Sequence, residues 1–173
     1  MQNITLKNAD QLKQKLNDIA NINVVGAINQ ATALVHGQAK ALAPANDGLL
    51  RNSIHMSVKN GVGRVYTNVE YASYVEFGTG IKGNGTYPYK IKGLNLKYES
   101  SPWYIPVDKI KEKDAQKYHF KKVQGKDGKE YYECYGQKSQ SFMYRALKEN
   151  EKLIKEILKK GVRDHLAQNC KGD

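Results

Sequence analysis

The sequence has little cysteine, little proline and no long hydrophobic run. Its two cysteines, Cys134 and Cys170, lack the CxxC spacing of a metal or redox site and cannot build a disulfide framework, so we expect both to be free. No apolar run approaches the ~18–20 residues that a membrane-spanning helix needs, and the start MQNITLKNADQLKQK lacks the apolar stretch of a secretory signal. The sequence therefore predicts a protein that is made in the cytoplasm.

Residues that could carry catalysis are equally sparse. The four histidines fall on four different expected elements, and no HxxxH, Cys-His pair or carboxylate cluster accompanies them. They are His36, His55, His119 and His165. No serine lies in a G-x-S-x-G elbow, and the glycines at 78–85 lack the Lys-Ser/Thr of a phosphate loop. We therefore expect no catalytic residue, metal or cofactor, and no enzyme.

What the chain does have is positive charge. The 173 residues suit one domain, residues 1–173, and carry a net charge of +11. Residues 1–80 contribute +2, residues 81–140 contribute +6 and residues 141–173 contribute +3. The middle segment also holds eight of the twelve tyrosines, so it differs in composition from its flanks. Tyrosines among lysines are typical of single-stranded nucleic-acid binding, but equally of a soluble, half-exposed hairpin.

Hydrophobic periodicity predicts helices at both ends of the chain. A short amphipathic helix is expected over residues 8–20, and a longer one over 22–43 that ends before Pro44. Its stripe of small and branched residues consists of Val24, Ile28, Ala31, Val35, Ala39 and Leu42. A last helix is expected from Ser141 to about Gln168, with Leu147 on its apolar side and Glu151–Lys155 and Glu156–Lys160 pairs on its outer side.

Strand patterns occupy the middle of the chain. Residues 53–60 and 63–70 alternate in polarity around Asn60-Gly61, which predicts a hairpin. Residues 71–80 fit a helical turn that leads into a short strand, and the assignment of this element stays open. Residues 81–140 read as an insertion of β-prone stretches, among them 87–93, that forms one or two long hairpins. The predicted fold class is α+β: N-terminal helices and a C-terminal helix packed on an antiparallel sheet, with this long hairpin or loop insertion.

Three segments in order carry a specific pattern: AKALAPANDGLLRNSIHMSV (39–58), VYTNVEYASYVEFGTG (65–80) and GQKSQSFMYRAL (136–147). Together they resemble the gene-product-ten-like family of neck proteins in HK97-type siphophages, which are head–tail joining, tail-completion or minor tail proteins. The chain departs from the family pattern at Ser141, where proline is usual, which predicts a looser entry to the last helix. It also departs in the length of residues 81–135. The motif positions are Pro44, Gly48, Leu50, Arg51, Ser53, Tyr71, Ala72, Glu76, Phe77, Gly78, Thr79, Gly80, Phe142, Ala146 and Leu147.

The resemblance implies a structural virion-assembly protein of a tailed phage or prophage, located in the neck or tail and in the host cytoplasm during assembly. Its implied partners are other neck and tail proteins, such as the connector, tail tube or terminator, in a homo-oligomeric ring. Whether the isolated protein is a monomer stays open, as does non-specific contact with double-stranded DNA in the lumen; no membrane partner is expected. A tail-terminator or tail-tube subunit and a small basic DNA-binding protein remain as alternatives.

Two residue-level expectations follow. Arg51 and Glu76 carry opposite charges within two of the motifs, so we expect them to lie near each other or at one subunit boundary. The insertion buries few aliphatic residues, so we expect it to be partly mobile in the isolated subunit and to become ordered on assembly. Any DNA affinity is then expected to depend on residues 84–133.

Overall fold

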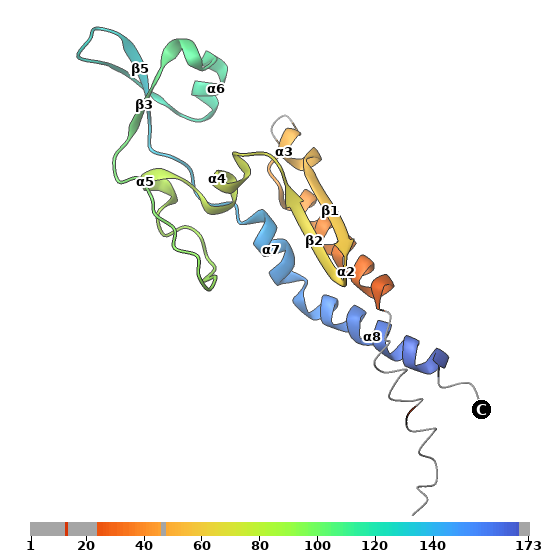
Figure 1. The fold of residues 1–173 in the computed structure, drawn as a ribbon. Coiled ribbons are helices and arrows are strands. Elements are labelled where there is room, and N and C mark those ends of the chain that lie inside the picture. Colours follow the sequence, from red (N-terminus) through yellow and green to blue (C-terminus); the bar gives the residue numbers. More distant parts are fainter. Residues whose placement is uncertain (1–12, 14–23, 46–47, 170–173) are drawn as a thin grey trace, which may run out of the picture. The chain divides into compact units, whose positions relative to one another are not determined.

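The computed structural model describes residues 13, 24–45 and 48–169, which divide into two compact units. The first consists of the described parts of Met1–Leu42, Arg51–Thr67 and Arg145–Asp173, and the second of those of Ala43–Leu50 and Asn68–Tyr144. Helices accompany two antiparallel sheets, so the predicted α+β class is confirmed (Figure 1). Apart from residue 13, the helix expected over residues 8–20 lies outside the described residues, as does Cys170.

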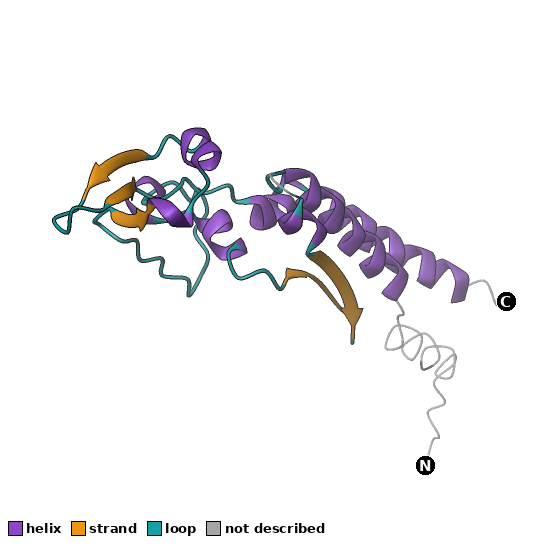
Figure 2. Cartoon of the chain, turned by 90° about the horizontal axis from the view of Figure 1, so that it is seen from above, coloured by secondary structure: helices purple, strands orange, loops and turns teal. Residues whose placement is uncertain are grey.

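Helix α2 (Val25–Leu42) is the centre of the first unit. It packs against strands β1 (Ile54–Lys59) and β2 (Val62–Thr67) and against helix α8 (Glu151–Asn169), as Figures 1 and 2 show. The predicted stripe faces these partners: its middle residues, Ala31, Val35 and Ala39, are buried and its ends are half-buried. Small residues permit the close approach, because a Cβ on Gly63 would overlap Thr32 and one on Gly161 would overlap Ala27.

The predicted hairpin is confirmed. Strands β1 and β2 pair antiparallel from Ile54↔Thr67 to Lys59↔Val62. The two residues between the strands, Asn60 and Gly61, both have positive φ, 50° and 71°, as a type I′ turn requires. Because side chains alternate between faces, one face of the hairpin packs on α2 and the other does not. Ile54, on the inner face, is completely buried.

The second unit is built around a small sheet in the insertion. Strands β3 (Trp103–Pro106), β5 (Glu130–Cys134) and β4 (Lys121–Gln124) form an antiparallel sheet in the order β3-β5-β4. The buried hydrophobic residues of the insertion are Ala115, Tyr132 and the free thiol Cys134. The β4–β5 hairpin around residues 125–128 agrees with the sequence. With so few apolar residues buried, this sheet has a small core.

One local expectation is wrong: residues 87–93, predicted to be β-prone, form no strand. The open question over residues 71–80 is answered by helix α4 (Ala72–Phe77), a single β-bridge at Thr79, and the start of α5 (Gly80–Gly83). The insertion also contains a 3-10 turn, η1 (Val107–Lys109), and helix α6 (Glu112–Lys117), which the turn-rich sequence concealed.

The last helix is interrupted. Helix α7 (Phe142–Glu149) ends at Asn150, whose side-chain amide donates to the carbonyl of Ala146 at 2.8 Å, and α8 begins at Glu151. The side-chain amide competes for a helical acceptor, which explains the break that hydrophobic periodicity could not reveal. No helix in the described ranges is long and apolar enough to cross a membrane.

Candidate assembly junction

The second and third sequence motifs meet in the second unit. Thr79 and Gln137 form an isolated antiparallel bridge, in which the N–H of Thr79 donates to the carbonyl of Gln137 at 2.9 Å and the reverse bond is 3.1 Å. The N–H of Gln140 donates to the carbonyl of Val75 at 2.9 Å. Residues about 60 positions apart in sequence are therefore joined through their backbones. We call residues 74–80 and 137–144 together the junction.

Glu76 is the buried centre of the junction, with 6% of its surface exposed. Its carboxylate accepts the N–H of Met143 at 2.8 Å and the N–H of Tyr144 at 3.1 Å. These are first-turn donors of α7 that no carbonyl of the helix can satisfy, and they carry the partial positive charge of a helix N-terminus. Glu76 therefore caps α7 from a distant part of the chain. Each such charge-assisted bond contributes about 1.5–3 kcal/mol.

The backbone of Glu76 holds the same segment. Its carbonyl accepts the N–H of Ser141 at 3.1 Å and the hydroxyl of Ser139. Ser141 is 4% exposed and has a φ of 51°, a conformation closed to proline. The expectation that Ser141 loosens the entry to the last helix is therefore wrong, because its N–H and its backbone conformation fasten that entry.

Tyrosines of the insertion surround Glu76. The hydroxyl of Tyr98 donates to the carbonyl of Phe77 at 2.9 Å, and the rings of Phe77 and Tyr87 meet edge to face at 5.0 Å. The ring of Tyr89 lies between those of Tyr87 and Tyr144, with centroid distances of 5.7 and 4.7 Å. Burial, and then the negative charge of Glu76, raises the pKa of Tyr87. These rings therefore have a structural role, which the nucleic-acid interpretation of the tyrosines did not include.

Glycines allow the two segments to touch. Gly78 has a φ of 81°, and a Cβ there would lie 2.8 Å from the nitrogen of Ser139 and 2.9 Å from the carbonyl oxygen of Gln137. A Cβ on Gly136 would overlap the carbonyl of Thr79. Only glycine combines this φ with so close a backbone contact.

The remaining motif residues divide into buried and exposed positions. Leu50, Ser53, Ala72, Gly80, Phe142 and Ala146 are buried, and Ser53 shares a 2.7 Å hydrogen bond with Thr67. Gly48 has a φ of 81°, which agrees with the predicted turn. Pro44 and Tyr71 are exposed, and so is Leu147, at 49%, although the periodicity placed Leu147 on the apolar stripe. Arg51 belongs to the first unit and Glu76 to the second, so their pairing stays a prediction.

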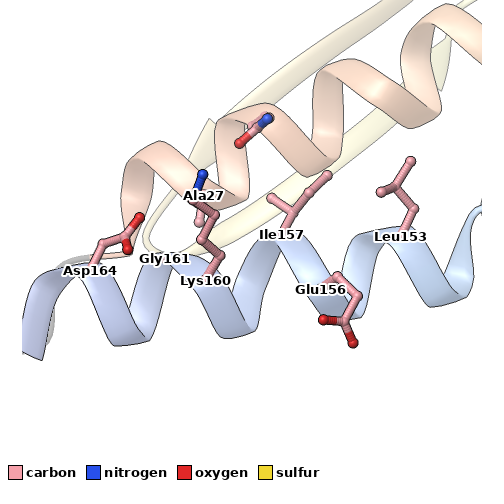
Figure 3. A pocket seen from close by; sticks show the side chains of 8 residues that line it. Ala27, Leu153, Glu156, Ile157, Lys160, Gly161 and Asp164 are labelled. Carbon is pink, nitrogen blue, oxygen red and sulfur yellow. The ribbon is translucent and has the colours of Figure 1, made fainter.

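A shallow groove lies between α2 and α8 in the first unit (Figure 3). Leu153 and Ile157 of α8 point toward α2, whereas Glu156 points away. The polar residues that line the groove, including Gln30, Lys160 and Asp164, are all exposed. The groove is therefore a packing seam without the buried polar groups of an active site. Among the described residues, no three His, Cys, Asp or Glu side chains gather as metal ligands would.

Comparison with known proteins agrees with the motifs. No curated protein and no solved structure matches the chain significantly. One family model does match, over residues 5–78, and that range includes the first motif and most of the second. The third motif lies beyond it but contacts the second through the junction. Over residues 5–78 the chain matches the model of the family described as "Bacteriophage HK97-gp10, putative tail-component", so the resemblance is confirmed over this range and points to a phage tail component.

Proposed function

We propose that the protein is a non-enzymatic virion-assembly protein of a tailed phage or prophage, which acts at the neck in head–tail joining or tail completion. The observation that carries the proposal is the junction, where the late motif at residues 136–147 contacts the motif at 71–80. The neck-protein resemblance rests on both motifs, and their contact supports treating them as one functional feature.

The chemistry of the junction favours a structural role over a catalytic one. Both oxygens of Glu76 accept backbone N–H groups, so this carboxylate is engaged in shaping the chain. The proposed partners are neighbouring neck and tail proteins, and further copies of the chain in a ring. A ring requires two different, complementary patches on each subunit, and the insertion provides an extended surface for one of them.

Deleting the gene in the parent phage and examining the particles by electron microscopy tests the proposal. Full heads and finished tails that accumulate unjoined would support a role in joining. Tails of irregular length would instead indicate a terminator, and missing tails a tube subunit, and either result would overturn the neck assignment.

Complementation adds residue-level resolution. Wild-type protein should restore joining, whereas Glu76→Ala should fail. Glu130→Gln is the matched control, since Glu130 is an exposed carboxylate of the same unit whose one ion pair among the described residues is with Lys122, at 3.4 Å. The control should complement fully.

A further inference from the structure

The outer face of the β1–β2 hairpin carries two exposed cations and an exposed histidine. Alternation places His55, Ser57 and Lys59 of β1 on this face, opposite Tyr66, Arg64 and Val62 of β2. The inner face is identified by Gly63, whose added Cβ would meet Thr32 and Ile28 of α2. Lys59, Arg64, His55 and Tyr66 are all exposed.

Among the described residues, no ion pair neutralises the two cations of this face. Residues 24–45 and 48–69 contain no Asp or Glu. Neither Lys59 nor Arg64 forms an ion pair within the part of the chain that the structure describes. In the insertion, by contrast, Lys122 pairs with Glu130 at 3.4 Å and Lys109 with Asp108 at 3.5 Å.

Every polar side chain on the outer face can donate a hydrogen bond, and none is only an acceptor. The rings of His55 and Tyr66 lie together, with centroids 5.9 Å apart, so two donor groups are held side by side. Neighbouring residues on one face of a strand are about 6.8 Å apart, which spreads the donors along the hairpin. A partner with many acceptor oxygens and negative charge complements such a face.

We propose that the outer face of the β1–β2 hairpin contacts the phosphates of double-stranded DNA without sequence specificity. Duplex DNA carries one negative charge per about 1.7 Å of its axis, and its major groove admits a two-stranded ribbon. An acidic protein fits less well, because the core of a protein interface is apolar and Val62, 46% exposed, is the one aliphatic side chain of the six. The site differs from the sequence expectation, which placed DNA affinity in residues 84–133.

The test measures binding of the full-length protein to a labelled 30-base-pair duplex of random sequence by fluorescence anisotropy, between about 50 and 300 mM salt. The variant Lys59→Gln/Arg64→Gln should make the slope of log affinity against log salt less steep by about 1.8, since each phosphate contact contributes about 0.9. The fold-loss of affinity between 50 and 200 mM salt should then be about tenfold smaller in the variant than in the wild type.

The matched control is Lys126→Gln/Lys129→Gln, which removes the same charge from two exposed lysines in the β4–β5 turn. The slope should not change in this control. If it changes there instead, or equally in both variants, the proposal is wrong, because the insertion or net charge alone would account for binding. Binding to polyglutamate but not to the duplex would assign an acidic protein partner and would also overturn it. Unchanged far-UV circular dichroism confirms that both variants fold.

This experiment is independent of the neck assignment. A tail-tube subunit or a neck protein could equally contact DNA through the hairpin, and a neck protein that binds no DNA would contradict only the present inference.

Discussion

The two compact units are stabilised by different interactions. The first buries aliphatic and small side chains where α2 packs on the hairpin, with Val35, Ala39 and Ile54 at its centre. The second buries the carboxylate of Glu76 and the side chain of Ser141 among half-buried tyrosine rings, and its sheet has a small apolar core. The first unit depends on packed volume, whereas the second depends on satisfied hydrogen bonds. The same kind of substitution should therefore act differently in each.

The largest effect is expected at Glu76. Glu76→Ala strands the N–H groups of Met143 and Tyr144 and should lower the free energy of unfolding by about 3–5 kcal/mol. Glu76→Gln keeps an acceptor and should lose roughly half as much. Trp103, the single tryptophan, lies in the second unit, so its fluorescence in a denaturant titration reports this transition. A wild-type midpoint for Glu76→Ala would refute the hydrogen-bonded account of the second unit.

Ile54 tests the packed unit. Ile54→Ala removes a completely buried side chain from between the hairpin and α2, which should cost about 3 kcal/mol. Circular dichroism at 222 nm follows α2 and α8 in this unit and should show the loss. If the Trp103 transition shifts by the same amount, the two units unfold together. The difference between them would then lie in their local interactions and not in separate stabilities.

Gly78 tests whether the close backbone contact in the junction stabilises the second unit. Gly78→Ala adds a Cβ beside the backbone of Ser139 and Gln137 at a φ of 81°, and should cost about 2–3 kcal/mol. Gly128→Ala is the control, since Gly128 has a φ of 78° with nothing near its added Cβ, and should cost about 1 kcal/mol. Thermal melts of both variants separate backbone strain from close contact. Equal losses of stability in Gly78→Ala and Gly128→Ala would mean that the two backbone segments of the junction can move apart without further cost.

The smallest effect concerns the surface of the first unit. Hydrogen bonds from Lys148 and Lys155 lower the pKa of Glu151 to about 2. Because the folded pKa is below the ordinary value of 4.5, this stabilisation is present above pH 4.5 and is lost as the pH falls toward 2. Glu151→Gln should slightly lower the melting temperature at pH 7, and the difference should disappear near pH 2. A constant difference across this range would contradict the ion-pair explanation.

Within the fold, the sequence was most informative where local rules apply. The period of the α2 stripe and the Asn60-Gly61 turn predicted the helix and the hairpin, because neighbouring residues decide both features. The predicted ion pair Lys155–Glu151 occurs at 2.7 Å, but Glu156 pairs with Lys159 and not with the predicted Lys160. Local pattern left residues 71–80 undecided and was wrong at residues 87–93, because contacts outside each segment determine its conformation.

For the junction, the sequence indicated the segments but not their contacts. Opposite charge suggested Arg51 as a partner of Glu76, because side-chain charge follows from residue type. The sequence does not indicate which backbone N–H groups a carboxylate will meet. Ser139, Tyr87 and Tyr98 went unnoticed as neighbours of α4, since no spacing in the sequence connects them with it.

The sequence by itself determined the α+β class, the hairpin, the small-residue helix face and the family resemblance, because these depend on local pattern and residue type. Only the tertiary structure decided that Glu76 caps α7, that Ser141 has a left-handed backbone, and that Lys59 and Arg64 form no ion pair with a described residue. The physical reason is that burial, backbone hydrogen bonds and ion pairing depend on which distant segments come into contact. Hydrophobic periodicity describes each segment alone and does not predict these tertiary contacts.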